Sequence, residues 1–175
     1  ARNLTAGARL ALFLPVRRLA FRVGVGHLLA LFAASALVDI GADAIRYGDD
    51  GVFSWYGLGN EVFSGGLLMA TAAVLSLLYR DRALALSLPV IALSAFPILQ
   101  VLHALPWTRL GVPAAAAGWL EWAILAWAVA MLVRTVAVAL EYRRTLRALR
   151  AIAGGLLLAA PIFIAPAIAP VDPWF

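Results

Sequence analysis

The sequence predicts an all-α fold: a polytopic integral membrane bundle of five transmembrane helices, with a cytoplasmic N-terminus and a periplasmic C-terminus. Composition is the first observation behind this prediction. Of the 175 residues, 65% are hydrophobic, and the mean hydropathy is +0.96. Soluble domains use about 45–50% apolar residues, and no soluble core could hide the excess. The bilayer is therefore predicted to be the solvent of most of the chain.

A long apolar run is the second observation. Between Ala114 and Leu140 only Glu121 and Arg134 are ionisable. As a helix these residues would reach about 40 Å, which exceeds the roughly 30 Å hydrocarbon core of a bilayer. An arginine-rich segment, residues 141–150, follows this run. Because clustered basic residues next to a span mark its cytoplasmic end, the run also has a predicted direction.

Arginine placement is the third observation. All 14 basic residues are arginine; 12 fall in segments predicted to be inside, and two, Arg46 and Arg109, in segments predicted to be outside. This asymmetry predicts the inward N-terminus and the outward C-terminus. The net charge of +5 does not indicate a nucleic-acid partner, because the arginines lie mostly between the predicted spans and at their ends and do not form one basic face.

Three segments make up the predicted organisation. Residues 1–22 are expected to be a cytoplasmic interfacial segment, residues 23–169 the five-span bundle, and residues 170–175 a periplasmic tail leading toward a possible downstream domain. The first segment does not resemble a signal peptide, because arginines follow its short apolar stretch. The spans are expected at residues 23–41, 62–79, 83–105, 114–140 and 151–169, and residues 42–61 are expected to form an acidic outward loop.

Small residues predict where helices approach each other. Gly66 with Ala70, and Gly155 with Ala159, are spaced one helical turn apart as small-xxx-small contacts. Arg134 is expected to extend toward the inner headgroups, since a long basic side chain can keep its charge in water while its stem stays in lipid.

Glu121 is the sharpest candidate for function. It lies about 12 Å along its helix from the outer mouth, a depth at which carboxylates are rare. It is either a structural glutamate packed beside Trp119 or Trp122, or a group that binds a cation, a cationic headgroup or a proton. Several polar residues are expected near it in the outer third of the bundle. They form either a binding cluster or an ordinary hydrated surface at the outer end of the helices: Asp39, Asp43, Asn60, Glu61 and His103. The predicted ligand-binding residues are Glu121, His103, Asp39 and Trp122.

Other chemistry has little support in these residues. There is no cysteine, and no catalytic dyad or phosphate-binding motif occurs, so no catalytic residue is predicted. His27 and His103 are predicted near opposite membrane faces, so one haem cannot bridge them. No cofactor and no metal are expected. Whether the protein is an enzyme stays open at this point.

The stretches NLTAGARLALFLPV, GVFSWYGL and LYRDRALALSLPVIALSAFPILQVL resemble the polytopic membrane region that precedes legumain-like peptidase domains of the C13 class in proteobacteria. A Yip1-like membrane domain is a looser resemblance. The first resemblance implies a peptidase whose cysteine and histidine lie in a downstream extracytoplasmic domain. No catalytic residue carries over, since this chain has no cysteine.

These observations predict a non-catalytic anchor or assembly module that holds a periplasmic domain or partner at the bacterial inner membrane. Two alternatives stay open: an accessory subunit of a larger membrane complex, and a binder of a lipid or lipophilic cofactor that uses the polar cluster around Glu121. The expected partners are the lipid bilayer and a periplasmic domain or membrane protein, not nucleic acid.

Overall fold

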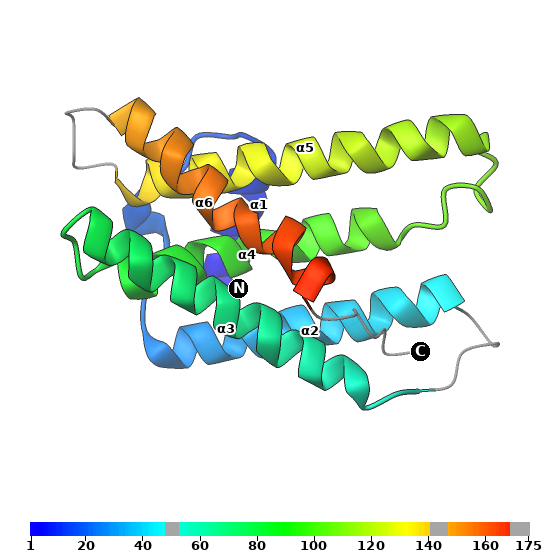
Figure 1. Cartoon of the computed structure of the whole chain (residues 1–175), viewed down its shortest axis with the longest axis horizontal. Coiled ribbons are helices and arrows are strands. Elements are labelled where there is room, and N and C mark those ends of the chain that lie inside the picture. The colour runs from blue at the N-terminus through cyan, green and yellow to red at the C-terminus, as the bar shows by residue number, and fades with distance from the viewer. Residues whose placement is uncertain (48–52, 141–146, 169–175) are drawn as a thin grey trace.

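The computed structural model describes residues 1–47, 53–140 and 147–168. These residues form helices joined by short connections (Figure 1). The predicted periplasmic tail, residues 170–175, and part of the arginine-rich segment lie outside the described residues. The helices are α1 (Arg2–Ala11), η1 (Arg18–Ala20), α2 (Val25–Tyr47), α3 (Tyr56–Leu78), α4 (Leu84–Ala104), α5 (Ala114–Ala139) and α6 (Arg147–Ile168).

Four of the described helices, α2 to α5, are long and apolar enough to cross a membrane. The prediction of a helical, multi-pass membrane bundle is confirmed at this level. The fifth predicted span corresponds to α6, whose described apolar stretch, Ala148–Pro161, is shorter than the other four. In Figure 1, α6 crosses α5 obliquely, and it packs on α5 and α3. A fifth crossing and the orientation therefore remain predictions.

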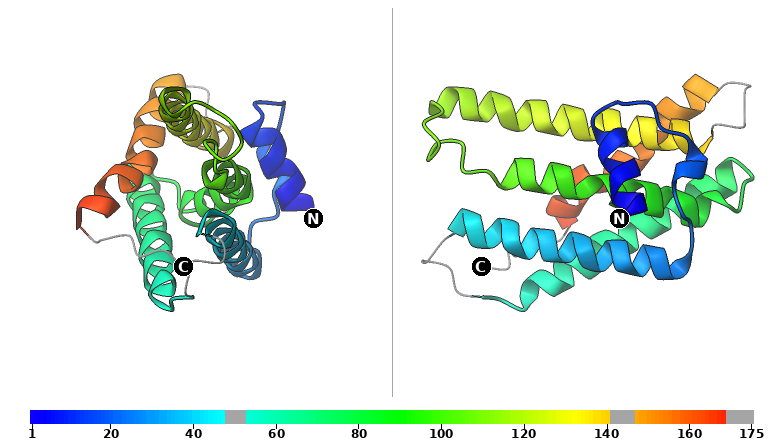
Figure 2. Two further views of the ribbon diagram at one scale, coloured as in Figure 1. Left: turned by 90° about the vertical axis from the view of Figure 1, so that its right-hand side faces the viewer. Right: turned by 180° about the vertical axis from the view of Figure 1, so that it is seen from behind.

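Helix α4 is the centre of the bundle. It contacts α1, α2, α3 and α5, and the end-on view in Figure 2 places it among them. Within the protein, 61% of its apolar window is buried, against 11% for α2. The helix continues through Pro89 and Pro97. A helix that is apolar all round can be enclosed by neighbours on every side, and the sequence of α4 meets that condition.

Two helices extend into the predicted outward loop. α2 continues to Tyr47, six residues beyond the expected end, and α3 begins at Tyr56 instead of residue 62. The prediction for residues 42–61 is therefore wrong over much of its length. Residues 42–47 contain neither proline nor glycine, so nothing stops α2 where the apolar run ends. As a result Asp43 and Glu61 are held on helices.

Close helix contacts occur at some of the predicted small residues but not at others. A Cβ atom on Gly155 would lie 2.3 Å from Val133 Cα, so this glycine does permit the α5–α6 contact. Gly66 has nothing within 4 Å of its Cβ position, and the prediction that it packs is wrong. Its neighbour Gly65 meets Phe32 instead, because one residue turns the contact face by about 100°.

The N-terminal helix α1 lies across the long helices, as the right-hand view of Figure 2 shows. Its apolar side, which includes Leu10 and Ala11, is buried, and it packs mainly on α4. The apolar side of this amphipathic helix is thus covered by protein. Whether the exposed side of residues 1–22 also lies at a membrane surface stays a prediction.

Arg134 of α5 hydrogen-bonds the end of α1, a contact that the sequence did not predict, and its expected position at the inner headgroups stays a prediction. Its Nη1 donates a hydrogen bond to the carbonyl oxygen of Leu10 (3.3 Å), its Nη2 donates to that of Leu14, and its guanidinium lies 5.3 Å from the centre of the Phe13 ring. Trp127 Nε1 also donates to Ala11 O, at 2.7 Å. Carbonyls at the end of a helix have no partner within that helix, so α5 supplies the donors that α1 needs there.

Candidate ligand-binding site

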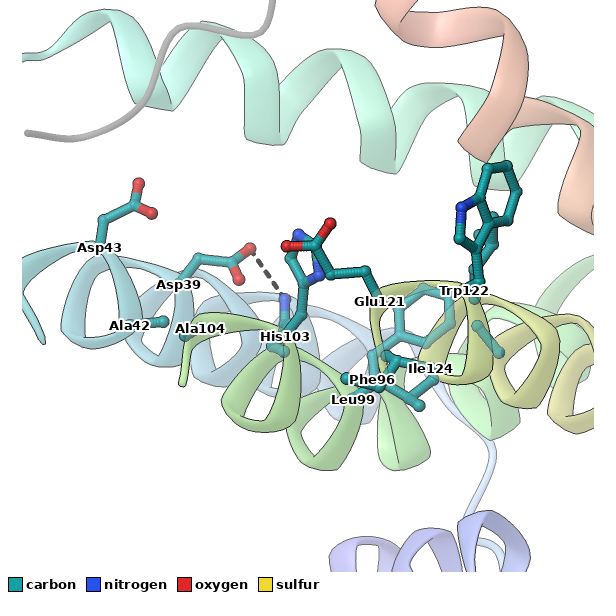
Figure 3. A pocket seen from close by; sticks show the side chains of 13 residues that line it. Asp39, Ala42, Asp43, Phe96, Leu99, His103, Ala104, Glu121, Trp122 and Ile124 are labelled. Carbon is teal, nitrogen blue, oxygen red and sulfur yellow. Dashed lines mark hydrogen bonds between the residues drawn. The ribbon is translucent and has the colours of Figure 1, made fainter. Parts of the chain in front are cut away.

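A cavity of about 550 Å³ lies between α2, α4 and α5. All four residues that the sequence predicted as ligand-binding line it: Asp39, His103, Glu121 and Trp122. In Figure 3, the Glu121 carboxylate and the His103 ring extend toward the side of the cavity where Asp39 lies, whereas Trp122 points away from Asp39 and Asp43. The structure therefore brings the predicted residues together around one space.

The direction of the helices explains this convergence. α2 and α4 run the same way and α5 runs back, so the ends of the first two meet the beginning of the third (Figure 1). Asp39 and Asp43 lie one turn apart near the end of α2, and His103 lies next to the last residue of α4. Glu121 lies about two turns into α5.

The walls of the cavity combine carboxylates with apolar side chains. Its acidic groups are Asp39, Asp43 and Glu121, and His103 is the one basic side chain among the lining residues. Most of the remaining lining residues are apolar: Ala42, Phe96, Leu99, Ala104, Ile124, Leu125 and Ala128. The electrostatic character of the cavity is therefore acidic at one side and hydrocarbon-like elsewhere.

Gln100 organises the polar side of the cavity, and the sequence analysis did not identify it. Its Nε2 donates to Asp39 Oδ2 and lies within hydrogen-bonding distance of Ser35 Oγ, each at 2.8 Å. The first of these bonds is drawn as the dashed line from Asp39 in Figure 3. A signal was present in the sequence: Gln100 is the single glutamine and sits in an apolar span, while Ser35, Asp39 and Asp43 recur every four residues on α2. Polar residues at that spacing share one face of a helix.

A second cavity, of about 190 Å³, lies between α2, α3 and α4. Asn60 and Glu61, which were predicted to belong to the outer cluster, line this space and not the first one. Asp39 and Gln100 line both cavities. The predicted polar cluster is therefore divided in two, with Asp39 and Gln100 at the boundary.

Glu61 is 8% exposed, and it lines the second cavity together with Asp39. Two neighbouring carboxylates repel each other when both are ionised. Gln100 donates to the same Asp39 side chain. The boundary between the cavities is thus a polar group from three helices: Asp39 on α2, Glu61 on α3 and Gln100 on α4.

Glu121 differs from this buried pair. Within the described part of the chain its carboxylate has no hydrogen bond and no ion pair, and the side chain is exposed. Trp119 and Trp122 are 76% and 68% exposed, so they do not enclose it. The interpretation of Glu121 as a structural glutamate satisfied by its neighbours therefore has no support in the described contacts. As far as the described residues go, its carboxylate is open to water, lipid or a ligand.

Among the described residues, no three His, Cys, Asp or Glu side chains come together as a metal site would need. No protein-family model, curated protein or solved structure matches the chain. The function is therefore inferred from the cavities and their residues.

Proposed function

We propose that this protein is a membrane-embedded binding module for a lipophilic molecule that carries a cationic or hydrogen-bond-donating group, held in the cavity between α2, α4 and α5. One observation carries the proposal. Three carboxyl groups, Asp39, Asp43 and Glu121, face a largely apolar cavity that has only one imidazole among its lining residues. The binding role is the one that the sequence predicted as an alternative for the cluster around Glu121.

The chemistry of the walls supports this choice of ligand. Phe96, Leu99 and Leu125 offer an apolar surface to a ring or an acyl chain. The volume of about 550 Å³ falls in the roughly 300–1,000 Å³ range of small-molecule sites. A carboxylate in a membrane-spanning helix is costly unless it faces water or a partner of opposite charge. A cationic group beside Glu121 would offset that cost, whereas an anionic one would add to it.

Tetraphenylphosphonium and tetraphenylborate test the proposal, because the two lipophilic ions have the same shape and opposite charge. Equilibrium binding is measured with the protein in zwitterionic lipid nanodiscs, after subtraction of empty nanodiscs. We expect saturable binding of the phosphonium and none of the borate. Glu121→Gln should weaken phosphonium binding by about tenfold or more, since a charged partner contributes about 1.5–3 kcal/mol.

Asp81→Asn is the matched control for this experiment. Asp81 lies in the α3–α4 turn at the opposite end of the bundle, and its Oδ1 accepts a hydrogen bond from Ala83 N that an asparagine can also accept. The control should bind the phosphonium as the parent does. Equal binding of both ions, or an unchanged affinity in Glu121→Gln, would contradict the proposal. The thermal stability of Glu121→Gln should hold or rise, because the change removes a charge that is costly at this depth.

The finer topology belongs to the same proposal: five spans in the bacterial inner membrane, with the N-terminus in the cytoplasm. The arginine asymmetry supports it. Reporter fusions after residues 50, 81, 109 and 147 should read out, in, out and in. A periplasmic reading at residue 147 would reverse the orientation and place the proposed ligand cavity in the inner leaflet.

An anchoring role is compatible with ligand binding. The resemblance to the membrane region in front of legumain-like peptidase domains supports a bundle that holds a periplasmic domain or partner membrane protein. An accessory subunit of a larger membrane complex would use the same surfaces. Affinity purification from cross-linked membranes tests both roles, since a stoichiometric partner is expected and its absence would count against them.

A further inference from the structure

A basic groove lies away from the ligand cavity, between α1, residues 15–20 and the C-terminal part of α5. Its volume is about 1030 Å³. Four arginines line it, Arg2, Arg9, Arg17 and Arg134, and no acidic side chain is among its lining residues. The groove therefore collects positive charge from the N-terminal 17 residues and from α5, which lies far away in the sequence.

Two of the four guanidinium groups are fixed in place by neutral carbonyls. Arg2 donates from Nε to Ala20 O at 3.0 Å and from Nη2 to Leu19 O at 2.8 Å. Arg134 donates to the carbonyls of Leu10 and Leu14. A guanidinium has five N–H donors, so each of these arginines keeps donors for another acceptor. Carbonyl oxygens are neutral, so the described residues leave the positive charges of Arg2 and Arg134 uncompensated.

The other two arginines have no partner in the described part of the chain. Arg9 and Arg17 are exposed, and neither side chain makes a hydrogen bond or an ion pair with another described residue. Four like charges around one groove repel each other unless an anion lies between them. Guanidinium groups match the geometry of phosphate oxygens, to which they can donate two parallel hydrogen bonds.

Apolar side chains border the groove. Leu19 lines it and is 84% exposed, and the neighbouring Leu12 and Leu14 are exposed as well. An exposed apolar border beside a basic groove suits a molecule with a phosphate head and an apolar tail. We propose that the groove binds a phosphate-bearing anion, and that this anion is the headgroup of an anionic phospholipid whose chains lie along the leucine border.

The test is a titration of the purified protein followed by native mass spectrometry, with phosphatidylglycerol, phosphatidylcholine and inorganic phosphate as separate probes. The parent should bind phosphatidylglycerol in preference to phosphatidylcholine. In the double variant Arg9→Gln/Arg17→Gln the affinity for phosphatidylglycerol should fall about 25-fold, from roughly fivefold per basic residue. Circular dichroism should give the parent's spectrum and a melting temperature no lower than the parent's, because neither side chain has a partner among the described residues and the change relieves repulsion.

The matched control is Arg82→Gln/Arg109→Gln, which removes the same charge at two exposed arginines that do not line the groove. It should keep the parent's preference for phosphatidylglycerol. Binding of inorganic phosphate that is lost in the Arg9/Arg17 variant would confirm the anion site and identify a soluble source. The proposal is overturned by an unchanged preference in the Arg9/Arg17 variant, by an equal loss in the control, or by no binding of either phosphate probe.

Discussion

Substituting Gly7 by alanine tests the tightest helix contact in the structure. A Cβ atom at this position would lie 1.9 Å from Ser94 O and 2.2 Å from Ser94 C, both of which are backbone atoms of α4. No rotamer change can relieve an overlap with backbone. α1 would have to move away from α4, and the hydrogen bonds that Trp127 and Arg134 donate to its last carbonyls would be strained or lost.

The magnitude follows from a comparison with Gly66→Ala. Gly66 is also inside a helix, but nothing lies within 4 Å of its Cβ position. Replacing glycine by alanine in an open helical position stabilises by up to about 1 kcal/mol. Overpacking a filled position costs about 1–3 kcal/mol. The gain in helix propensity applies to both glycines and cancels in the comparison, so the free energy of unfolding of Gly7→Ala should lie about 1–3 kcal/mol below that of Gly66→Ala.

The assay has a global and a local measurement, both on protein purified in detergent. Thermal unfolding followed by circular dichroism gives the order of the parent and the two variants. Limited trypsin digestion reports on α1 itself, since Arg9 and Arg17 flank its C-terminal end and should be cut faster once the helix separates from α4. Equal stability of Gly7→Ala and Gly66→Ala, together with unchanged cleavage, would refute the close packing of α1 on α4.

Three further changes probe the remaining contacts, each measured as a shift in melting temperature against a matched variant. Gln100→Leu should cost about 1–3 kcal/mol because Asp39 loses a donor, and no further cost is expected in the Asp39→Ala background, which has no side-chain acceptor, if that bond is the cause. Tyr79→Phe removes the 2.6 Å hydrogen bond to the carbonyl oxygen of Arg150 and should cost about 0.5–1.5 kcal/mol; no loss would mean that α3 and α6 do not meet there. Gly155→Ala should destabilise by about 1–3 kcal/mol through overlap with α5, whereas Gly118→Ala, which has open space around it, should not; similar behaviour of the two would argue against the α5–α6 contact.

Several parts of the site could be predicted from the sequence because charge is rare in this chain. Ionisable residues within long apolar runs are conspicuous, and the period of a helix converts their positions into depth along the span. Asp39, His103 and Glu121 were predicted to lie near the same end of the bundle on this basis, and they do line one cavity. Gln100 and Ser35 were not predicted, because neutral polar side chains do not interrupt an apolar run. Only the tertiary contact with Asp39 identifies them as part of the site.

By itself, the sequence determined the helical, multi-pass character of this protein, since backbone groups in lipid must be satisfied within each segment and only apolar runs of sufficient length can cross. It also determined which ionisable residues lie deep within a membrane span, where such residues are rare. The tertiary structure alone decided which faces meet. In a soluble helix the apolar face marks the core, but α2 to α5 are apolar on nearly all sides, so hydropathy does not separate lipid-facing from protein-facing residues. For that reason packing geometry, and not residue spacing, decided four features. They are the contact at Gly65 instead of Gly66, the packing of α1 on α4, the hydrogen bonds from Arg134 to the end of α1, and the division of the polar cluster into two cavities.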